Sequence, residues 1–188
     1  ILFSPELARS RQRRQADRKV ARLREHFVIC GEGEMVDRTI AFLIQRTRAR
    51  LDSGRRYPFL RPLTPTLLDK VVVVTKNMRS ATKLRREGIL VIDGDPTDSE
   101  VLRRSGIDHA QALMAMEDTD TETLLTVLTA NSRNPNLPIS AAAHDSTFAP
   151  KMLRAGANNV IPPYEVAAQF LNSVTFRPVV SEFFSSLL

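Results

Sequence analysis

The sequence has little cysteine, few aromatic residues and no long apolar run. Cys30 is the one cysteine among 188 residues, so an intramolecular disulfide framework is excluded and a reducing cytoplasm fits. No stretch approaches the roughly 18 consecutive apolar residues of a membrane-spanning helix. No secretory signal pattern is present and the sequence begins with Ile1, so we expect a fragment of a longer polypeptide.

Positive charge is concentrated at the N-terminus. Residues 1–25 hold eight Lys and Arg residues and three acids, and therefore carry five of the six net positive charges. No aromatic side chains are interleaved with these arginines, so we predict no nucleic-acid binding. A solvated helix or linker and a segment next to a membrane both fit the pattern. We predict a basic juxtamembrane linker over residues 1–25, adjacent to anionic headgroups.

Short apolar runs alternate with helical patterns along the rest of the chain. The runs predict strands at residues 26–30, 70–75, 89–93, 112–116, 137–143 and 159–161. The helical patterns cover residues 35–46, 79–87, 99–105, 119–132, 147–155 and 163–175. Continuous apolar strands are buried on both faces, and helices between them imply right-handed crossovers. The predicted fold class is α/β: a Rossmann-like, doubly wound, mostly parallel six-stranded sheet with helices on both faces.

Residues 47–69 interrupt this alternation. They contain Gly54, Pro58, Pro62 and Pro65 among several arginines, and they are longer than a compact crossover needs. We expect an exposed, basic insertion that is partly helical and then a flexible loop. No chemistry is assigned to it.

A glycine turn follows the first predicted strand, in the order Gly31, Glu32, Gly33, Glu34, Met35. Strand, turn and helix start are the context of a dinucleotide-binding turn, in which backbone N–H groups face a phosphate. Two features depart from the pattern. Val36 stands at the position of the third glycine, and the two glutamates put negative charge where an anion would bind.

The end of the second strand lacks the acid that usually bonds a ribose. It reads Thr75, Lys76, Asn77, and Lys76 together with Arg79 could meet a phosphate instead. Retained and lost nucleotide binding both remain open from these residues.

Catalytic groups do not form a set in the sequence. His26 and Cys30 belong to the first strand and fit structural roles, His109 fits a surface turn, and His144 follows the fifth strand at the ligand edge of the sheet. Hydride transfer needs an acid or base beside the substrate. We therefore predict that the chain is not an enzyme, with a nicotinamide-dependent oxidoreductase as the alternative from another class.

Several ordered motifs resemble the regulator-of-potassium-conductance (RCK) domain, also called the Trk-type N domain. The resembling segments are residues 26–31, 84–98, 101–102, 105–107, 117–123 and 153–164. The resemblance spans roughly residues 26–170, apart from the insertion. It implies a cytoplasmic ligand-sensing gating domain of a potassium channel, at the cytoplasmic face of the cell membrane. A separate regulatory subunit of a Trk/Ktr-type potassium transporter is the alternative.

The resemblance also implies ligands and a binding site. The family's ligands include NAD(H), NADP(H), ATP, ADP and divalent cations. By position, phosphates would meet Gly31–Met35 and the ribose would meet Thr75, Lys76 and Asn77. The adenine would lie near Asp95, Pro96 and Thr97, with Glu117 and Asp118 along the edge. Metal ligands stay unassigned, because the acids at Glu117, Asp118, Asp120 and Glu122 are better explained as an acidic helix start.

The last residues are too apolar for a free tail. The apolar set is Phe176, Val179, Val180, Phe183, Phe184, Leu187 and Leu188. The resemblance implies a crossover helix and a dimer-flanking segment over residues 163–188, after an RCK domain over residues 26–162. We expect a homodimer that assembles into a tetrameric channel or gating ring below a pore on the same polypeptide. Packing on the parent domain is the alternative.

Overall fold

The computed structural model describes residues 5–53 and 66–176, which contain a six-stranded sheet. The strands are β1 (Phe27–Gly31), β2 (Val71–Thr75), β3 (Leu90–Asp93), β4 (Ala112–Met116), β5 (Ile139–Ala142) and β6 (Asn159–Ile161). Their order is β3-β2-β1-β4-β5-β6, and all five pairings are parallel. The predicted α/β fold is confirmed. Its strand order reverses between β1 and β4, where ligands bind in such sheets.

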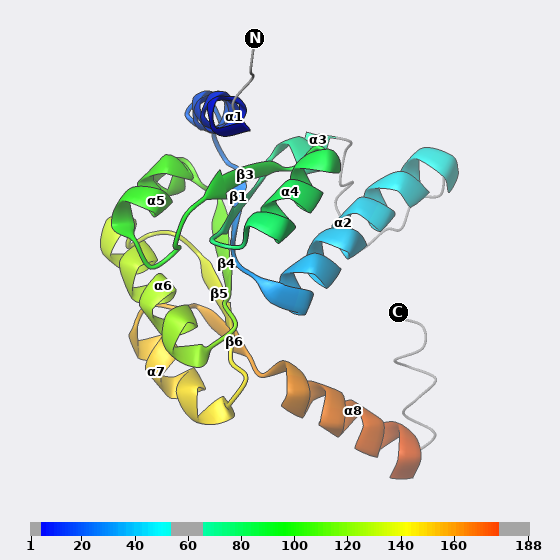
Figure 1. Cartoon of the computed structure of the whole chain (residues 1–188). Helices are drawn as coiled ribbons and strands as arrows, with labels where there is room; N and C mark the ends of the chain where they lie inside the picture. The colour runs from blue at the N-terminus through cyan, green and yellow to red at the C-terminus, as the bar shows by residue number, and fades with distance from the viewer. Residues whose placement is uncertain (1–4, 54–65, 177–188) are drawn as a thin grey trace.

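Helices cover both faces of this sheet (Figure 1). The helices are α1 (Pro5–Val20), α2 (Gly33–Ser53), α3 (Thr66–Asp69), α4 (Met78–Arg86), α5 (Ser99–Arg104), α6 (Asp120–Arg133), α7 (Ala149–Arg154) and α8 (Pro163–Phe176), with 3-10 turns η1 (Ile107–His109) and η2 (Ser146–Phe148). Because β1–β3 alternate in the face they present, two separate clusters form. Val28 and Cys30 pack with residues of α5, α6 and α7, whereas Ile29 packs with residues of α2 and α4.

Element boundaries differ from the predicted ones at two informative places. The fifth strand starts at Ile139 and not at Leu137, because Pro138 has no N–H to donate to a ladder. Helix α2 continues to Ser53, so the insertion predicted to start at Thr47 is helical for its first seven residues. Arg, Ala and Leu favour helix in this stretch, and Gly54 is the first helix breaker. The remaining insertion up to Pro65 lies outside the described residues.

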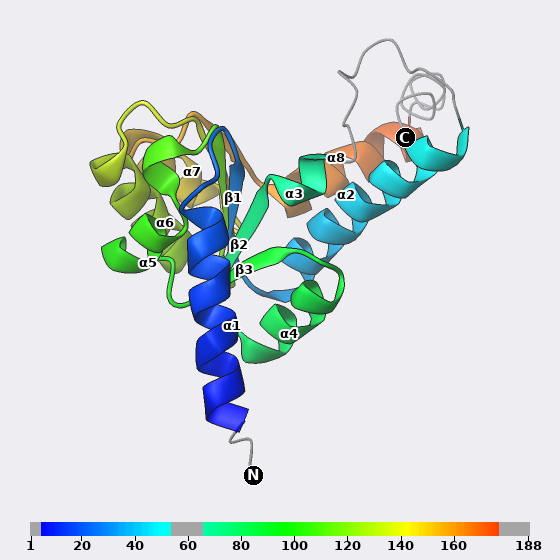
Figure 2. The same ribbon diagram turned by 90° about the horizontal axis from the view of Figure 1, so that it is seen from above.

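The basic N-terminal segment forms a helix, α1, that packs against β3 and then projects beyond the sheet (Figure 2). Val20 is fully buried in the core. Arg13 Nε lies 3.0 Å from Asp93 Oδ2, and Arg104 Nη2 lies 3.0 Å from Asp17 Oδ1. The C-terminal half of the helix is therefore attached to the domain by one core side chain and two ion pairs.

Helix α8 has the opposite character. It leaves β6 and extends away from the sheet, and no residue along it is buried (Figure 1). Its exposed apolar side chains are Tyr164, Val166, Leu171, Val174 and Phe176. The rest of the predicted dimer-flanking segment lies outside the described residues. Among the described helices, none has both the length and the apolar character that crossing a bilayer requires.

Candidate ligand-binding site

The glycine turn brings β1 against the end of β4 so closely that no larger residue fits. Gly31 has φ +137°, and a Cβ there would lie 2.0 Å from the carbonyl oxygen of Met116. Gly33 has φ +81°, and a Cβ there would lie 2.6 Å from Asp118 Oδ1. Gly31 is therefore required by the close backbone of Met116 as well as by its conformation. Gly33 is required by its positive φ, because the exposed Asp118 side chain could move aside. The turn presents backbone to the strand-switch crevice, as the sequence predicted.

The first turn of α2 explains two departures from a dinucleotide-binding pattern. Val36, at the position of the third glycine, is buried with Ile29 and Ile40 and so fills the space between helix and sheet. Glu34 accepts hydrogen bonds from Arg38, with Oε1 2.6 Å from Nη2. The Glu34 charge is therefore balanced one helical turn away, and the helix start keeps its N–H groups and positive dipole end.

Lys76, at the end of β2, is the centre of an ion-pair network. Its Nζ lies 2.5 Å from Glu122 Oε1 of α6 and 3.5 Å from Glu32 Oε1 of the glycine turn. The hydrogen bond to Glu122 raises the pKa of Lys76 above its usual range. The same bond, with one from Thr119, lowers the pKa of Glu122. Lys76, which the sequence suggested could meet a phosphate, therefore pairs with two carboxylates in the fold.

Two other residues at the end of β2 serve the backbone. Asn77 caps α4, because its Oδ1 accepts from the N–H groups of Arg79 and Ser80. Thr75 is buried, and its Oγ1 accepts from the N–H of Asn77. Arg79 is exposed on α4. These contacts fix the turn after β2, and Arg79 stays exposed there together with Lys76 and Met78.

The loop after β3 is also preformed. Asp95 Oδ1 accepts from both the N–H and the Oγ1 of Thr97, at 2.9 and 2.7 Å. Burial opposes ionisation of Asp95, but the bonds from Thr97 and the nearby Lys76 outweigh it and lower the pKa. Thr129 of α6 donates to the Thr97 carbonyl, and Pro96 is buried. The predicted adenine loop is therefore held in place by α6.

Glu117, directly after β4, is a buried carboxyl. It is 3% exposed, and the hydroxyl of Thr126 donates to its Oε1 at 3.3 Å. Burial raises its pKa to about 8, although the Thr126 bond and Lys76 act in the other direction. Glu117 is therefore mostly neutral at pH 7 and can donate a hydrogen bond. Its neighbour Asp118 is exposed and lies against Gly33.

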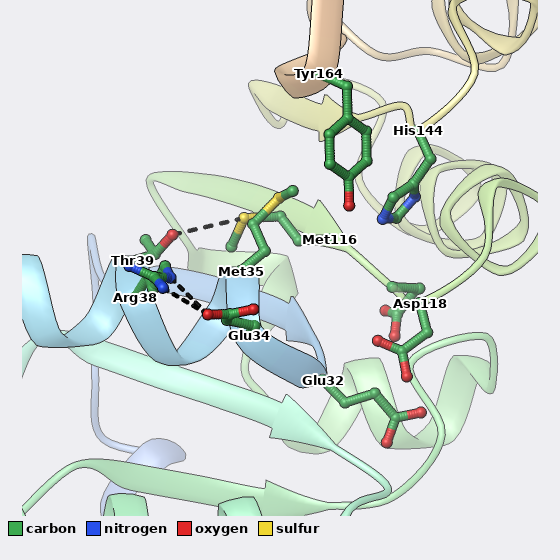
Figure 3. Close-up of a pocket in the computed structure, with 10 residues that line it drawn as sticks. Glu32, Glu34, Met35, Arg38, Thr39, Met116, Asp118, His144 and Tyr164 are labelled. Carbon is green, nitrogen blue, oxygen red and sulfur yellow. Dashed lines mark hydrogen bonds and ion pairs between the residues drawn. The ribbon is translucent and has the colours of Figure 1, made fainter. Parts of the chain in front are cut away.

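A pocket of about 380 Å³, here called the acidic pocket, opens between the start of α2 and the ends of β4 and β5 (Figure 3). Its lining residues are Glu32, Glu34, Met35, Arg38, Thr39, Met116, Glu117, Asp118, His144 and Tyr164. The rings of Tyr164 and His144 lie 5.9 Å apart on one side, and the thioethers of Met35 and Met116 lie on another (Figure 3). His144 Nδ1 is buried, makes no hydrogen bond among the described residues, and is 3.4 Å from Asp120 Oδ1.

The predicted site residues therefore divide into two groups around the glycine turn. The β2–β3 side contains Thr75, Lys76, Asn77, Asp95, Pro96 and Thr97. The β4–β5 side contains the acidic pocket, which five predicted residues line: Glu32, Glu34, Met35, Glu117 and Asp118. Arg38, Thr39, Met116 and Tyr164 were missed. Tyr164 directly follows the β6–Pro162–Pro163 segment, and the convergence of parallel strand ends was the available signal.

The residues that the structure describes do not assemble a metal centre. Within them, no group of three or more His, Cys, Asp and Glu side chains is placed to hold a metal ion. Asp120 instead accepts from the N–H groups of His144 and Asp145. His26 is buried with Nε2 2.8 Å from the Ser105 carbonyl, and burial lowers its pKa. Burial raises the pKa of the Cys30 thiol.

The chain is similar to known proteins over most of its length. Residues 62–163 match the model of the TrkA-N domain. The chain is 27% identical over 170 residues to "Probable potassium channel protein 2" of Methanocaldococcus jannaschii, covering 90% of this chain and 44% of that protein. It is 25% identical over 178 residues to "Potassium channel protein 1" of the same organism, covering 95% and 47%. The chain thus spans less than half the length of these relatives.

Solved structures agree with the sequence comparison. The "GsuK channel bound to NAD" is 27% identical with a TM-score of 0.61, and the match covers 80% of this chain and 24% of that one. The TrkA-N domain of the inner membrane protein YbaL from Escherichia coli has a TM-score of 0.63 at 19% identity, covers 81% of this chain and 98% of that one, and shows the fold. The resemblance drawn from the sequence motifs is confirmed.

Proposed function

Because the chain belongs to the TrkA-N domain family, we propose that it is the ligand-sensing regulatory domain of a potassium channel, at the cytoplasmic face of the membrane. One observation carries this proposal: the alignments with the two potassium channel proteins cover 90% and 95% of the chain. They therefore extend well beyond the 102 residues, 62–163, that match the family model. The function expected from the sequence is the one that these relatives support.

The ligand is a nucleotide that crosses the glycine turn. Structures titled as GsuK bound to NAD and to ADP are 27% and 26% identical to this chain and support such a ligand. Phosphates would meet the backbone from Gly31 to Met35 at the start of α2. The adenosine half would occupy the β2–β3 side, against Lys76 and the Asp95–Thr97 loop.

Through Lys76, ligand binding at the glycine turn would affect the position of α6. It joins the glycine turn to α6 through Glu32 and Glu122. A phosphate near the turn competes with both carboxylates for the same ammonium group. Binding therefore favours a conformation in which the contact between Lys76 at the end of β2 and Glu122 of α6 is rearranged. How far the ligand shifts the balance between the two conformations depends on how much more tightly it binds one than the other.

Assembly completes the proposal. The exposed apolar side chains of α8, such as Leu171 and Phe176, suit contact with a second copy in a homodimer of a gating ring. The basic helix α1 suits the connection to a pore on the same polypeptide, close to anionic lipid. This division of the chain into a linker, a ligand-binding domain and a dimerisation helix follows the predicted boundaries at residues 25 and 162.

The domain acts as a sensor and not as an enzyme. The named relatives above are potassium channel proteins. One observation favours a second candidate, a separate subunit of a Trk transporter. A "Trk system potassium uptake protein TrkA homolog" of Pyrococcus horikoshii is 32% identical over 104 residues, covering 53% of this chain and 44% of that protein.

Nucleotide binding and flux measurements test the proposal. ADP, ATP and NAD+ should raise the melting temperature of the 188-residue chain, and calorimetry should give saturable binding. Lys76→Gln should weaken nucleotide binding severalfold, because two carboxylates then lose their cation. Lys70→Gln, at the turn residue directly before the opposite end of β2, is the matched control and should bind as the parent does.

The full-length protein in potassium-loaded liposomes should then show ion flux that changes on addition of the nucleotide that binds. Absence of binding by every nucleotide would overturn the sensing role. Flux that appears only after mixing with a separate membrane protein would favour the transporter subunit.

A further inference from the structure

We infer that one side of helix α1, here called its outer face, binds the surface of a bilayer that contains anionic lipids, so that such lipids are a second ligand of the domain. The outer face consists of Arg11, Arg14, Gln15 and Arg18. The inference rests on the proposed function only for the place of α1 next to a membrane. No step of it uses the nucleotide site, so the two proposals can fail separately.

The opposite side of α1 is attached to the domain. Val20 is fully buried in the core. Arg13 Nε lies 3.0 Å from Asp93 Oδ2, and Arg104 Nη2 lies 3.0 Å from Asp17 Oδ1. Steps of three and four residues put Arg13, Asp17 and Val20 on one side of an α-helix. These contacts fix the rotation of α1 about its own axis, and they decide which side is turned outward.

The outer face carries positive charge without a carboxylate of its own. At 3.6 residues per turn, its three arginines and Gln15 lie about 120° to 180° around the helix axis from Val20. All four side chains are exposed. Asp17, the one acid between Arg11 and Val20, lies on the attached side and is paired with Arg104. Three cations therefore point away from the domain along about 10 Å of helix.

No element that the structure describes covers this face. Helix α1 is seen end-on at the top of Figure 1, with β3 and α5 below it, and from the side in Figure 2, where its first turns stand clear of the sheet. The acidic pocket opens at the start of α2, well below α1 in the view of Figure 1. A flat surface can therefore approach α1 while the carboxylates of the pocket stay away from it.

Anionic headgroups match the outer face in charge and in shape. A guanidinium group donates two parallel hydrogen bonds to phosphate oxygens. Each Lys or Arg close to an anionic leaflet strengthens binding about fivefold. Residues 11, 14, 15 and 18 include no apolar side chain, so the contact is with headgroups and needs no insertion into the hydrocarbon.

Nucleic acid carries phosphates as well, but it fits this helix less well. A DNA major groove takes up a helix that is free on most of its circumference. Helix α1 is instead attached along one side to β3, through Arg13 and Asp93. A plane of charge needs contact with one side of the helix, which is the side that α1 offers. The geometry therefore favours a bilayer as the partner.

Co-sedimentation of the 188-residue chain with lipid vesicles tests the inference. We expect binding to phosphatidylcholine vesicles that contain about one-quarter phosphatidylglycerol, and none to phosphatidylcholine alone. About 0.5 M salt should release the chain, because it screens the charges. The combined change Arg11→Gln, Arg14→Gln and Arg18→Gln should weaken binding about a hundredfold, and Gln15→Arg, which adds a cation to the same face, should strengthen it about fivefold.

A second triple variant is the matched control. It replaces with Gln three exposed cations that lie on α4 and α7: Arg86, Lys151 and Arg154. This variant loses the same net charge as the α1 variant, and it should bind anionic vesicles within about twofold of the parent. Both variants should unfold at the parental temperature, because surface changes of this kind cost little stability.

Three outcomes would overturn the inference. The first is equal weakening by the two triple variants, since net charge alone would then explain binding. The second is equal binding to neutral and anionic vesicles. The third is tighter binding to a short DNA duplex than to the anionic vesicles. Nucleotide binding by the α1 triple variant should equal that of the parent, so a failed vesicle experiment leaves the proposed nucleotide sensing standing.

Discussion

The two sides of the glycine turn are built differently. On the β2–β3 side, Lys76 is paired with two carboxylates, and Asp95 accepts two bonds from Thr97. On the β4–β5 side, Asp118 is unpaired and His144 Nδ1 makes no hydrogen bond among the described residues. Buried polar groups without partners are uncommon in folded proteins. The polar groups named on the β2–β3 side are therefore paired with other protein groups, whereas Asp118 and His144 Nδ1 on the β4–β5 side make no hydrogen bond among the described residues.

Paired and unpaired side chains should differ in how much they contribute to the stability of the fold. Substituting a residue on the paired side breaks contacts that exist in the fold, whereas substituting Asp118 breaks no hydrogen bond or ion pair among the described residues. The expected effects of substitutions follow this distinction. Gly31, which belongs to the turn between the two sides, should give the largest loss of unfolding free energy when it is replaced.

Gly31→Ala should be the most destabilising change, because it disturbs the turn from which both sides are built. Its Cβ would meet the Met116 carbonyl at 2.0 Å, with φ at +137°. A loss of at least about 3 kcal/mol of unfolding free energy is expected. Gly88→Ala, at φ +86° with nothing within 4 Å, is the control and should cost about 1 kcal/mol. Urea denaturation measures both, and equal losses would contradict the steric argument.

Glu117 should make stability depend on pH. Its pKa is about 8 in the fold and near 4.5 when unfolded, so the folded chain holds the extra proton between these values. Its contribution is present below pH 4.5 and is lost as the pH rises to about 8, on the order of a few kcal/mol. Glu117→Gln should remove this part of the slope and be the more stable protein at pH 8. Denaturation between pH 5 and 8.5 measures it, and exposed Glu165→Gln should keep the parental slope.

Lys76→Gln should cost about 1 kcal/mol or less, because both members of its pair with Glu122 are about one-third exposed and screened by solvent. The loss should shrink further in high salt. A large, salt-independent loss would show that the network supports the fold directly. Comparison with Lys70→Gln in the same denaturation series supplies the background for a change of one charge.

Asp118→Asn should have the smallest effect on stability, within about 0.5 kcal/mol of the parent, because its carboxylate makes no contact that the substitution removes. A marked loss of stability on this substitution would show that the β4–β5 side is as complete as the β2–β3 side, and would remove the difference between them.

The sequence was most informative where a pattern is local. Continuous apolar runs such as Val71–Val74 predicted the strands, and the alternation with helices predicted the parallel sheet. The glycines predicted the turn, although the contact that demands Gly31 is with Met116, which only the pairing of β1 with β4 reveals. Helix α2 was predicted too short because its basic second half lacks an apolar periodicity.

The sequence predicted where the candidate site residues lie along the chain, but not which of their charged side chains pair with one another. Lys76 and Glu122 are 46 residues apart, and no local pattern indicates that they pair. The sequence indicated Lys76 as a residue that could meet a phosphate or a ribose, but it did not indicate that Lys76 also pairs with Glu32 and Glu122. The acidic pocket was missed as a cavity for the same reason. Its walls come from the start of α2, the end of β4, His144 and Tyr164, and tertiary packing alone brings these together.

The attachment of α1 has a mechanical consequence. Asp93 forms ion pairs with Arg13 of α1 and Arg85 of α4, and the next residues, Gly94 to Thr97, form the loop that we propose to lie beside the adenosine half of the ligand. From Arg13 towards Pro5 the helix overhangs its attachment by about 12 Å. A rotation of about 10° at the attachment would carry the free end by about 2 Å, so the helix has the geometry of a short lever whose fulcrum, Asp93, directly precedes the loop proposed to contact the ligand.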